Sequence, residues 1–101
     1  MRLASGIAPL REWIDAGVNV GLGVDGSSSN DSGNLLNEAR QAMLLQRVNL
    51  GANKFSPREA LYTATRGGAN ILNRNDIGQI CVGKAADFAI YDLNNISLSG
   101  T

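Results

Sequence analysis

Hydrophobic and polar positions change their spacing along the chain, and each spacing predicts a different element. Apolar residues recur at helical spacing over residues 7–16, where Pro9 lies near the first turn and Gly17 is placed to end a helix. Strict alternation follows and predicts a buried strand over 18–24. Its apolar positions are Val18, Val20, Leu22 and Val24.

The next segment, residues 25–34, contains only Asp, Gly, Ser and Asn. These residues bend chains and hydrogen-bond to the nearby backbone, so the segment predicts a polar loop. Helical spacing then returns and predicts an amphipathic helix over 35–50. Its expected buried side is formed by Leu35, Leu36, Ala39, Met43 and Val48.

A second helix start is encoded by the sequence Ser-Pro-Arg-Glu that begins at Ser56. Ser56 is placed as the N-cap, Pro57 as the first helical residue, and Glu59 as the partner that completes a capping box. The adjacent glycines 67–68 carry a combined helix penalty of about 2 kcal/mol relative to alanine. We therefore expect this helix to falter there, before a last short turn over 69–72.

The period changes again near the end of the chain. The pattern predicts two short strands, 79–82 and 87–91, joined by a turn at Gly83 and Lys84. Cys81 alternates with apolar neighbours and is expected to be a buried structural thiol. Because helices alternate with strands, the fold class expected for the chain is α/β with a parallel sheet.

Composition excludes several classes of function. The chain has 101 residues, with nine Lys and Arg balancing nine Asp and Glu. This balance argues against nucleic-acid and membrane-surface partners, which need clustered basic residues. A single cysteine and the lack of a long apolar run fit a cytoplasmic protein. The chain contains no histidine, which excludes a Ser-His-Asp triad or a histidine metal cage built from this chain alone.

Asp25 is the strongest candidate for a catalytic residue in the sequence. It ends the predicted strand, and α/β barrels place catalytic groups at the carboxyl ends of strands. By alternation it shares its side with Gly21 and Gly23, so we expect its carboxylate to point into a space free of bulky side chains. Asp-Gly after a strand is also a common turn. Spacing alone favours the turn and leaves the catalytic interpretation open.

Two stretches of the chain resemble one family. Residues 2–31 resemble the last strand-and-loop region of the amidohydrolase superfamily, in its cytosine, guanine, 8-oxoguanine and chlorotriazine aminohydrolase branch; they read RLASGIAPLREWIDAGVNVGLGVDGSSSND. Residues 78–93 are similar to the closing signature of that family and read GQICVGKAADFAIYDL. Within the branch, the chain most resembles 8-oxoguanine deaminases and hydroxyatrazine-type aminohydrolases.

The resemblance implies a (β/α)8 TIM barrel with a small β-sandwich domain. Residues 1–75 would form the last strand and terminal helices of the barrel, and residues 76–101 part of the sandwich. The resemblance also implies a divalent metal, zinc or iron, held mostly by histidines. Asp25 matches the carboxylate that contacts this metal and takes a proton from the attacking water. Ser27 and Asn30, with Gly26, would line the pocket for a purine, pyrimidine or triazine, although such residues more often structure a loop.

The chain departs from the family because it has no histidine ligand, and one carboxylate does not replace the usual three protein ligands of catalytic zinc. We interpret it as a carboxyl-terminal fragment of a metal-dependent aminohydrolase or chlorohydrolase. Alone it should neither hold metal tightly nor turn over substrate. Unpaired strand edges would favour self-association into homo-oligomers. The alternative is a non-catalytic module that uses the 25–34 loop to bind an ion or a partner.

Overall fold

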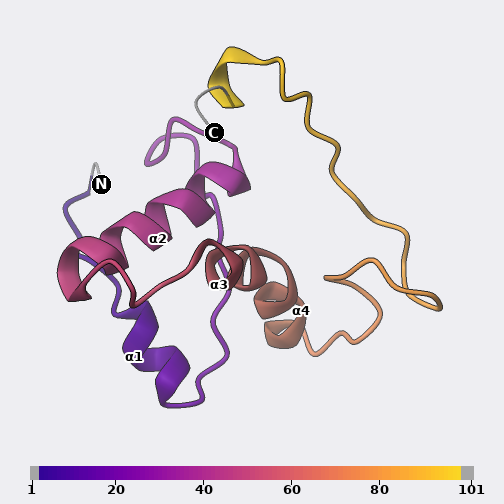
Figure 1. Cartoon of the computed structure of the whole chain (residues 1–101), viewed down its shortest axis with the longest axis horizontal. Helices are drawn as coiled ribbons and strands as arrows, with labels where there is room; N and C mark the ends of the chain where they lie inside the picture. The colour runs from indigo at the N-terminus through magenta and orange to yellow at the C-terminus, as the bar shows by residue number, and fades with distance from the viewer. Residues whose placement is uncertain (1–2, 99–101) are drawn as a thin grey trace.

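The computed structural model describes residues 3–98, which form helices joined by long coil segments (Figure 1). In chain order the elements are α1 (Leu10–Asp15), α2 (Leu35–Leu50), α3 (Pro57–Tyr62), the π-helix η1 (Thr63–Gly67), α4 (Gly68–Ile71) and the 3-10 helix η2 (Ile96–Leu98). No β-strand occurs among residues 3–98. Within the same range, no helix has the length and apolar character needed to cross a membrane.

Helix α1 begins at Leu10, three residues later than the helix expected over 7–16. Pro9 is its N-cap residue rather than a residue of the first turn, and Ile7 is exposed. The proline explains the late start, because its ring disfavours the helical conformation of the residue before it. The end agrees with the prediction, since Gly17 adopts a φ of 78° in the left-handed region.

Helix α2 covers the predicted range 35–50, and its buried side is the expected one in part, since Ala39 is buried and Met43 packs against the core. The Asn34 side-chain oxygen caps it by accepting hydrogen bonds from two backbone amides of the first turn, at 3.0 and 3.4 Å. Val48, expected in the core, is 84% exposed, and Leu35 is also exposed. The buried residues are Ala39, Ala42 and Gln46. The hydrophobic pattern did not predict Gln46 as a buried residue, because glutamine is polar.

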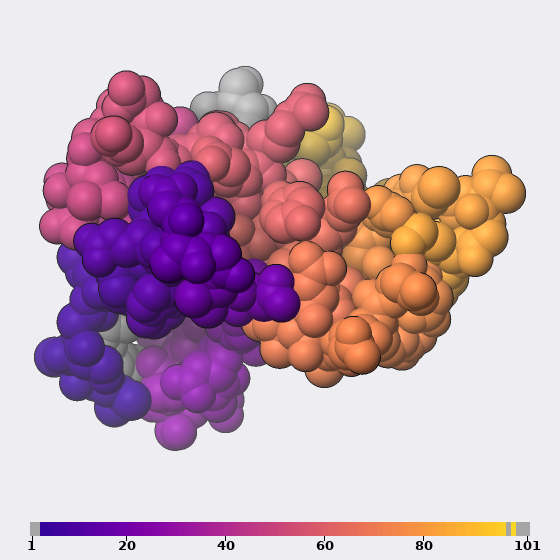
Figure 2. Space-filling model, turned by 90° about the horizontal axis from the view of Figure 1, so that it is seen from below, coloured from indigo at the N-terminus to yellow at the C-terminus, as the bar shows by residue number. Residues whose placement is uncertain are grey.

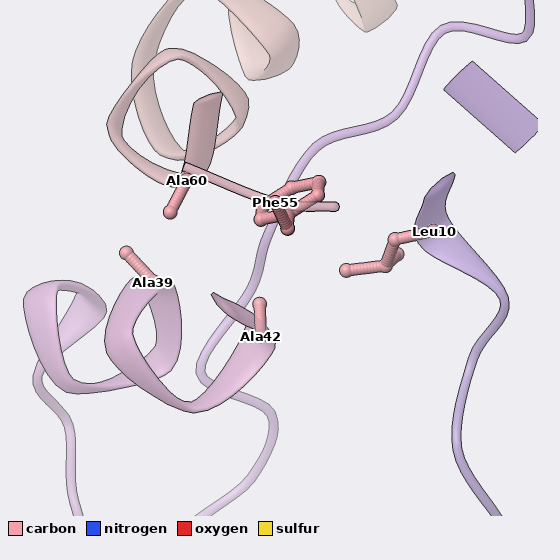
Figure 3. Packing of buried hydrophobic residues seen from close by; sticks show 5 residues of the cluster. All are labelled: Leu10, Ala39, Ala42, Phe55 and Ala60. Carbon is pink, nitrogen blue, oxygen red and sulfur yellow. The ribbon is translucent and has the colours of Figure 1, made fainter. Parts of the chain in front are cut away.

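The core is a small cluster shared by α1, α2 and the start of α3. Phe55 lies at its centre and is fully buried. Figure 3 shows its five members pointing toward one another: Leu10, Ala39, Ala42, Phe55 and Ala60. Five half-buried residues pack against them: Ile14, Val20, Leu22, Met43 and Ala64.

Gln46 joins α2 to the segment around α1. Its Nε2 donates to the Ala8 carbonyl at 2.8 Å, and its Oε1 accepts from the Arg11 backbone amide at 3.1 Å. Both ends of the amide are therefore hydrogen-bonded, which is the usual condition for burying a polar side chain. The pair of bonds fixes the N-terminal segment on α2.

Helix α3 has the cap that the sequence predicts. The Ser56 Oγ accepts from the Glu59 amide at 3.2 Å, and the Glu59 Oε2 accepts from the Ser56 amide at 2.8 Å. Pro57 is the first helical residue. The helix does not end at the two glycines but widens into η1 and continues as α4. The Thr63 and Thr65 hydroxyls donate to carbonyls one turn earlier, at 2.8 Å each, and such bonds bend or loosen a helix.

Residues 18–24 do not form the buried strand that their alternation predicts. A strand needs hydrogen bonds to a neighbouring strand, and the described part of the chain supplies no such neighbour. Some of the apolar positions of the pattern nevertheless face the core, as the alternation predicts. Val20 and Leu22 pack against the core, whereas Val18 is 52% exposed.

This segment lies against η1 and α4 at glycine positions. A Cβ added to Gly67 would lie 2.2 Å from the Val20 carbonyl oxygen, and one added to Gly21 would lie 3.1 Å from the Gly68 Cα. Because a side chain would overlap these backbone atoms, glycine permits the close approach. The contact sets the position of the segment that leads to Asp25.

The predicted strands 79–82 and 87–91 are also absent from the described residues, for the same physical reason. After α4 the chain leaves the helical cluster as coil (Figure 1) and forms a lobe that projects beside it (Figure 2). Cys81 is exposed, so the prediction of a buried thiol is wrong. The radius of gyration is 14.5 Å, above the value of about 13 Å typical of a compact domain of this length, because the tail is open.

Candidate active site

Asp25 follows the segment 18–24 directly and opens the polar loop. Its φ is 60°, in the left-handed region that non-glycine residues seldom occupy. Aspartate tolerates this conformation better than most residues, because its short side chain can hydrogen-bond locally. Backbone conformations of this kind concentrate at functional sites. Among residues 3–98, Ala4 and Asn73 share this conformation, with φ of 51° and 52°, so the backbone alone does not distinguish Asp25.

Two donors from the loop hold the Asp25 carboxylate. Its Oδ1 accepts from the Gly26 amide at 2.7 Å, and its Oδ2 accepts from the Ser29 hydroxyl at 2.7 Å. The Ser29 hydroxyl, followed by the Gly26 amide, lowers the pKa of Asp25 below its usual 3.8. The carboxylate is thus ionised at neutral pH, which is the form that binds a metal ion.

The space around the carboxylate is open, as expected. Asp25 is exposed and shares a shallow hollow of about 130 Å³ with Ser29 and the three residues Leu3, Ala4 and Ser5. A Cβ added to Gly23 would have no atom within 4 Å. Gly21 differs, because it faces α4 rather than this hollow.

Asn30 directs its amide toward the protein. Its Nδ2 donates to the Val24 carbonyl at 2.7 Å and to the Glu38 Oε1 at 2.6 Å, while its Oδ1 accepts from the Ser32 amide at 3.1 Å. Ser27 is exposed in the turn that follows Asp25. The substrate-binding role of Ser27 and Asn30 stays a prediction.

Two residues of this site were missed by sequence reasoning. Ser29 holds the Asp25 carboxylate, and Glu38 holds the Asn30 amide from the first turn of α2. No periodic pattern reveals such pairs, because side-chain contacts in an irregular loop do not follow a fixed spacing. The available signal was composition: a polar loop between Asp25 and a helix must satisfy its side chains locally.

Residues 3–98 do not complete a metal site by themselves. Across residues 3–98, no group of three or more His, Cys, Asp or Glu is placed to hold a metal ion. Catalytic zinc usually has three protein ligands plus a water. Asp25 can supply one carboxylate ligand, and the Asn30 Oδ1 nearby accepts from the Ser32 amide. The described residues therefore fit a metal centre as the source of one protein ligand only.

Comparison with known proteins gives a consistent result. Residues 1–100 match the model of the Amidohydrolase family. The chain is 52% identical over 101 residues to an 8-oxoguanine deaminase from Pseudomonas aeruginosa, which is all of this chain and 22% of that protein. It is 49% identical over 88 residues to a hydroxydechloroatrazine ethylaminohydrolase from Pseudomonas sp. strain ADP, covering 84% of this chain and 18% of the relative.

The solved structures agree. An atrazine chlorohydrolase from Arthrobacter aurescens TC1 complexed with zinc superposes with a TM-score of 0.80 and 45% identity, over 95% of this chain and 22% of that one. All three of these similar proteins are named as enzymes: a deaminase, an ethylaminohydrolase and a chlorohydrolase. The chain belongs to the amidohydrolase family, and it spans about a fifth of the length of the relatives it matches, 22% for the deaminase.

The family resemblance expected from the sequence is thereby confirmed. The family match and the similarity to solved structures support the interpretation of the chain as a piece of the amidohydrolase barrel. The β-sandwich part stays a prediction.

Proposed function

We propose that this chain is part of a metal-dependent hydrolase that removes an amino or chloro substituent from a heterocyclic ring. The observation that carries the proposal is the family match over residues 1–100, which includes Asp25 and its loop. Its relatives are named for action on 8-oxoguanine, hydroxydechloroatrazine and atrazine, which are all nitrogen heterocycles. A purine, pyrimidine or triazine is the substrate class that fits them together.

Asp25 is the metal ligand and catalytic residue that this chain contributes. Its carboxylate is ionised and exposed, and each oxygen keeps a lone pair beyond the bond to Gly26 or Ser29. A divalent metal, when bound, lowers the pKa of its water toward neutrality. Asp25 orients the attacking water and accepts its proton, and the exposed Ser27 lies on the rim where the ring would bind.

The remaining ligands come from other parts of the intact protein. The relatives are about five times longer than the match, and one of them was solved with zinc; iron is the other candidate. In the intact protein, residues 1–75 would complete the barrel and residues 76–101 the β-sandwich. Residues 1–2 and 99–101 of these two units lie outside the described residues. We place the protein in the cytoplasm.

The test is a chimera in which this chain replaces the matching 22% of the Pseudomonas aeruginosa deaminase. We expect the chimera to bind zinc or iron and to release ammonia from 8-oxoguanine. The 101-residue chain alone should do neither. The unaltered deaminase is the control for the assay. A chimera with native-like circular dichroism and bound metal that releases no ammonia from 8-oxoguanine would contradict the proposal.

A further inference from the structure

We infer that Asn30 and Glu38 form a latch that positions Asp25, so that Asn30 acts on the protein rather than on the substrate. The inference rests on the proposed catalytic role of Asp25. It concerns two side chains outside the carboxylate itself, and it assigns a role to Glu38 on α2. Both side chains are half-buried, where hydrogen bonds are stronger than in water.

The first step is the contact between Asn30 and the backbone. Asn30 Nδ2 donates to the Val24 carbonyl at 2.7 Å. That carbonyl belongs to the peptide group that leads into Asp25, so the bond fixes the plane from which the Asp25 side chain projects. Asp25 itself has a φ of 60°. A non-glycine residue keeps this conformation only when its surroundings hold it there.

The second step is the contact with α2. The other Nδ2 hydrogen of Asn30 is donated to the Glu38 Oε1 at 2.6 Å. Glu38 precedes Ala39, which is 3% exposed and belongs to the core, so its backbone is anchored. The latch therefore holds Asp25 in a fixed position relative to the packed helix α2. Functional side chains need this support from rigid elements.

The third step is the hydrogen-bond inventory of Asn30. Its two donor hydrogens are both used, and its oxygen accepts from the Ser32 amide at 3.1 Å. A substrate could gain a donor from Asn30 only by breaking one of these bonds. A positioning role uses the bonds as they stand.

Substitutions in the deaminase chimera test the latch. Glu38→Ala removes the acceptor, and we expect kcat for 8-oxoguanine to fall by about 10- to 100-fold with KM little changed, as for other partners that orient a metal-site ligand. Glu38→Gln keeps an Oε1 acceptor and should restore most of kcat. Combining Asn30→Ala with Glu38→Ala should lower kcat no further than Asn30→Ala alone, because both changes break the same latch.

Asn37→Ala is the matched control. Asn37 is adjacent to Glu38 in α2, and its Nδ2 donates to the Ser32 hydroxyl at 3.2 Å, so it also ties the loop to the helix. Among the described residues the Asn37 side chain makes no hydrogen bond to Val24 or Asp25, so kcat should not change. Either of two results would overturn the latch: a rise in KM at constant kcat in Asn30→Ala with Glu38→Ala silent, or a loss in Glu38→Gln equal to that in Glu38→Ala.

A spectroscopic readout separates this inference from the proposed function. Nuclear magnetic resonance of the 101-residue chain can follow the Gly26 amide, which donates to Asp25 Oδ1, and the Asn30 side-chain amide. Glu38→Ala should shift the first and accelerate exchange of the second, whereas Asn37→Ala should do neither. If the unsubstituted chimera were inactive, the proposed function would fail while these spectra still decided the latch. Unchanged spectra in Glu38→Ala would reject it.

Discussion

Gly67 and Gly68 are neighbours in one helical segment, but their surroundings differ. Both have helical backbone angles, with φ of −58° and −60°. A Cβ on Gly67 would lie 2.2 Å from the Val20 carbonyl oxygen, whereas a Cβ on Gly68 would have no atom within 4 Å. Only the first glycine is required by packing, because the atom it faces is backbone and cannot rotate away.

Alanine substitutions at the two positions should therefore have opposite effects. Gly67→Ala should lower the free energy of unfolding by about 1–3 kcal/mol, as overpacked sites do. Gly68→Ala should raise it by about 0.5–1 kcal/mol, because alanine favours the helix. Urea unfolding followed by circular dichroism measures both. Equal effects at the two positions would show that segment 18–24 does not lie against η1.

Single residues also show how far the sequence could predict the site. Asp25 could be proposed as a site residue from the sequence, because it stands at a boundary between two patterns and within a family motif. Ser29 and Glu38 could not, because their contacts depend on the path of an irregular loop. The role of Asn30 was ambiguous for the same reason, since an amide in a polar loop can face either the substrate or the protein.

The amino end of α3 is an element whose structure follows directly from its local sequence. The Glu59 Oε2 accepts from the Ser56 amide at 2.8 Å and from the Ser56 hydroxyl at 2.7 Å, and its Oε1 accepts from Arg11 at 2.6 Å. The Ser56 amide, then the Ser56 hydroxyl and then Arg11, lower the pKa of Glu59 below its usual 4.5. The capping box thus also links α3 to α1.

This pKa shift predicts an acid-sensitive helix start. A carboxyl with a lowered folded-state pKa stabilises the fold above its usual pKa, and the contribution is lost as pH falls through the folded-state value. The free energy of unfolding should therefore decrease as pH falls below 4.5. Ser56→Ala should raise the pKa of Glu59, make this decrease shallower, and cost about 1 kcal/mol at neutral pH through the lost cap.

Carbon-detected magnetic resonance of the Glu59 carboxyl, together with urea unfolding across the acid range, measures these effects. Ser27→Ala, a serine outside the cap, is the control and should leave the Glu59 titration unchanged. A Glu59 pKa at or above 4.5 in the unsubstituted chain would contradict the capping geometry.

Helices and strands were predictable to different degrees. The sequence predicted the start of α3 from its capping box, and it predicted the full range of α2 from helical spacing. The segments 18–24, 79–82 and 87–91 have the alternation of strands, but a strand is stabilised by a neighbour and not by its own pattern. For 18–24 the sequence predicted the side that packs, as Val20 and Leu22 show, but not the secondary structure. For the other two segments it predicted neither, since Ile80, Val82 and Ile90 are exposed.

The whole molecule combines a small core with a long exposed apolar tail. Five apolar side chains form the buried cluster around Phe55. In contrast, Ile80, Val82 and Ile90 are 82%, 101% and 91% exposed. Exposed apolar stretches of this kind promote association. We propose that the same tail packs in the intact protein and drives self-association of the isolated chain.

Sedimentation velocity across a range of concentrations tests this proposal. The chain should form homo-oligomers as concentration rises. The double substitution Ile80→Ser with Ile90→Ser should weaken association about tenfold or more, because it removes two apolar side chains that association would bury. Val48→Ser, at an 84% exposed position on α2, is the control and should change little. A compact monomer at all concentrations would argue against an association-prone tail.

Metal content and turnover of the deaminase chimera, with and without Asp25→Asn, test the central claim most directly. The substitution keeps the size of the side chain but removes the charge and the proton acceptor, so kcat should fall by about 100- to 10,000-fold with weaker zinc binding. Asp92→Asn, in an exposed turn of the tail, should leave both quantities unchanged. A folded Asp25→Asn chimera that kept its zinc and its full kcat would contradict the assignment of Asp25.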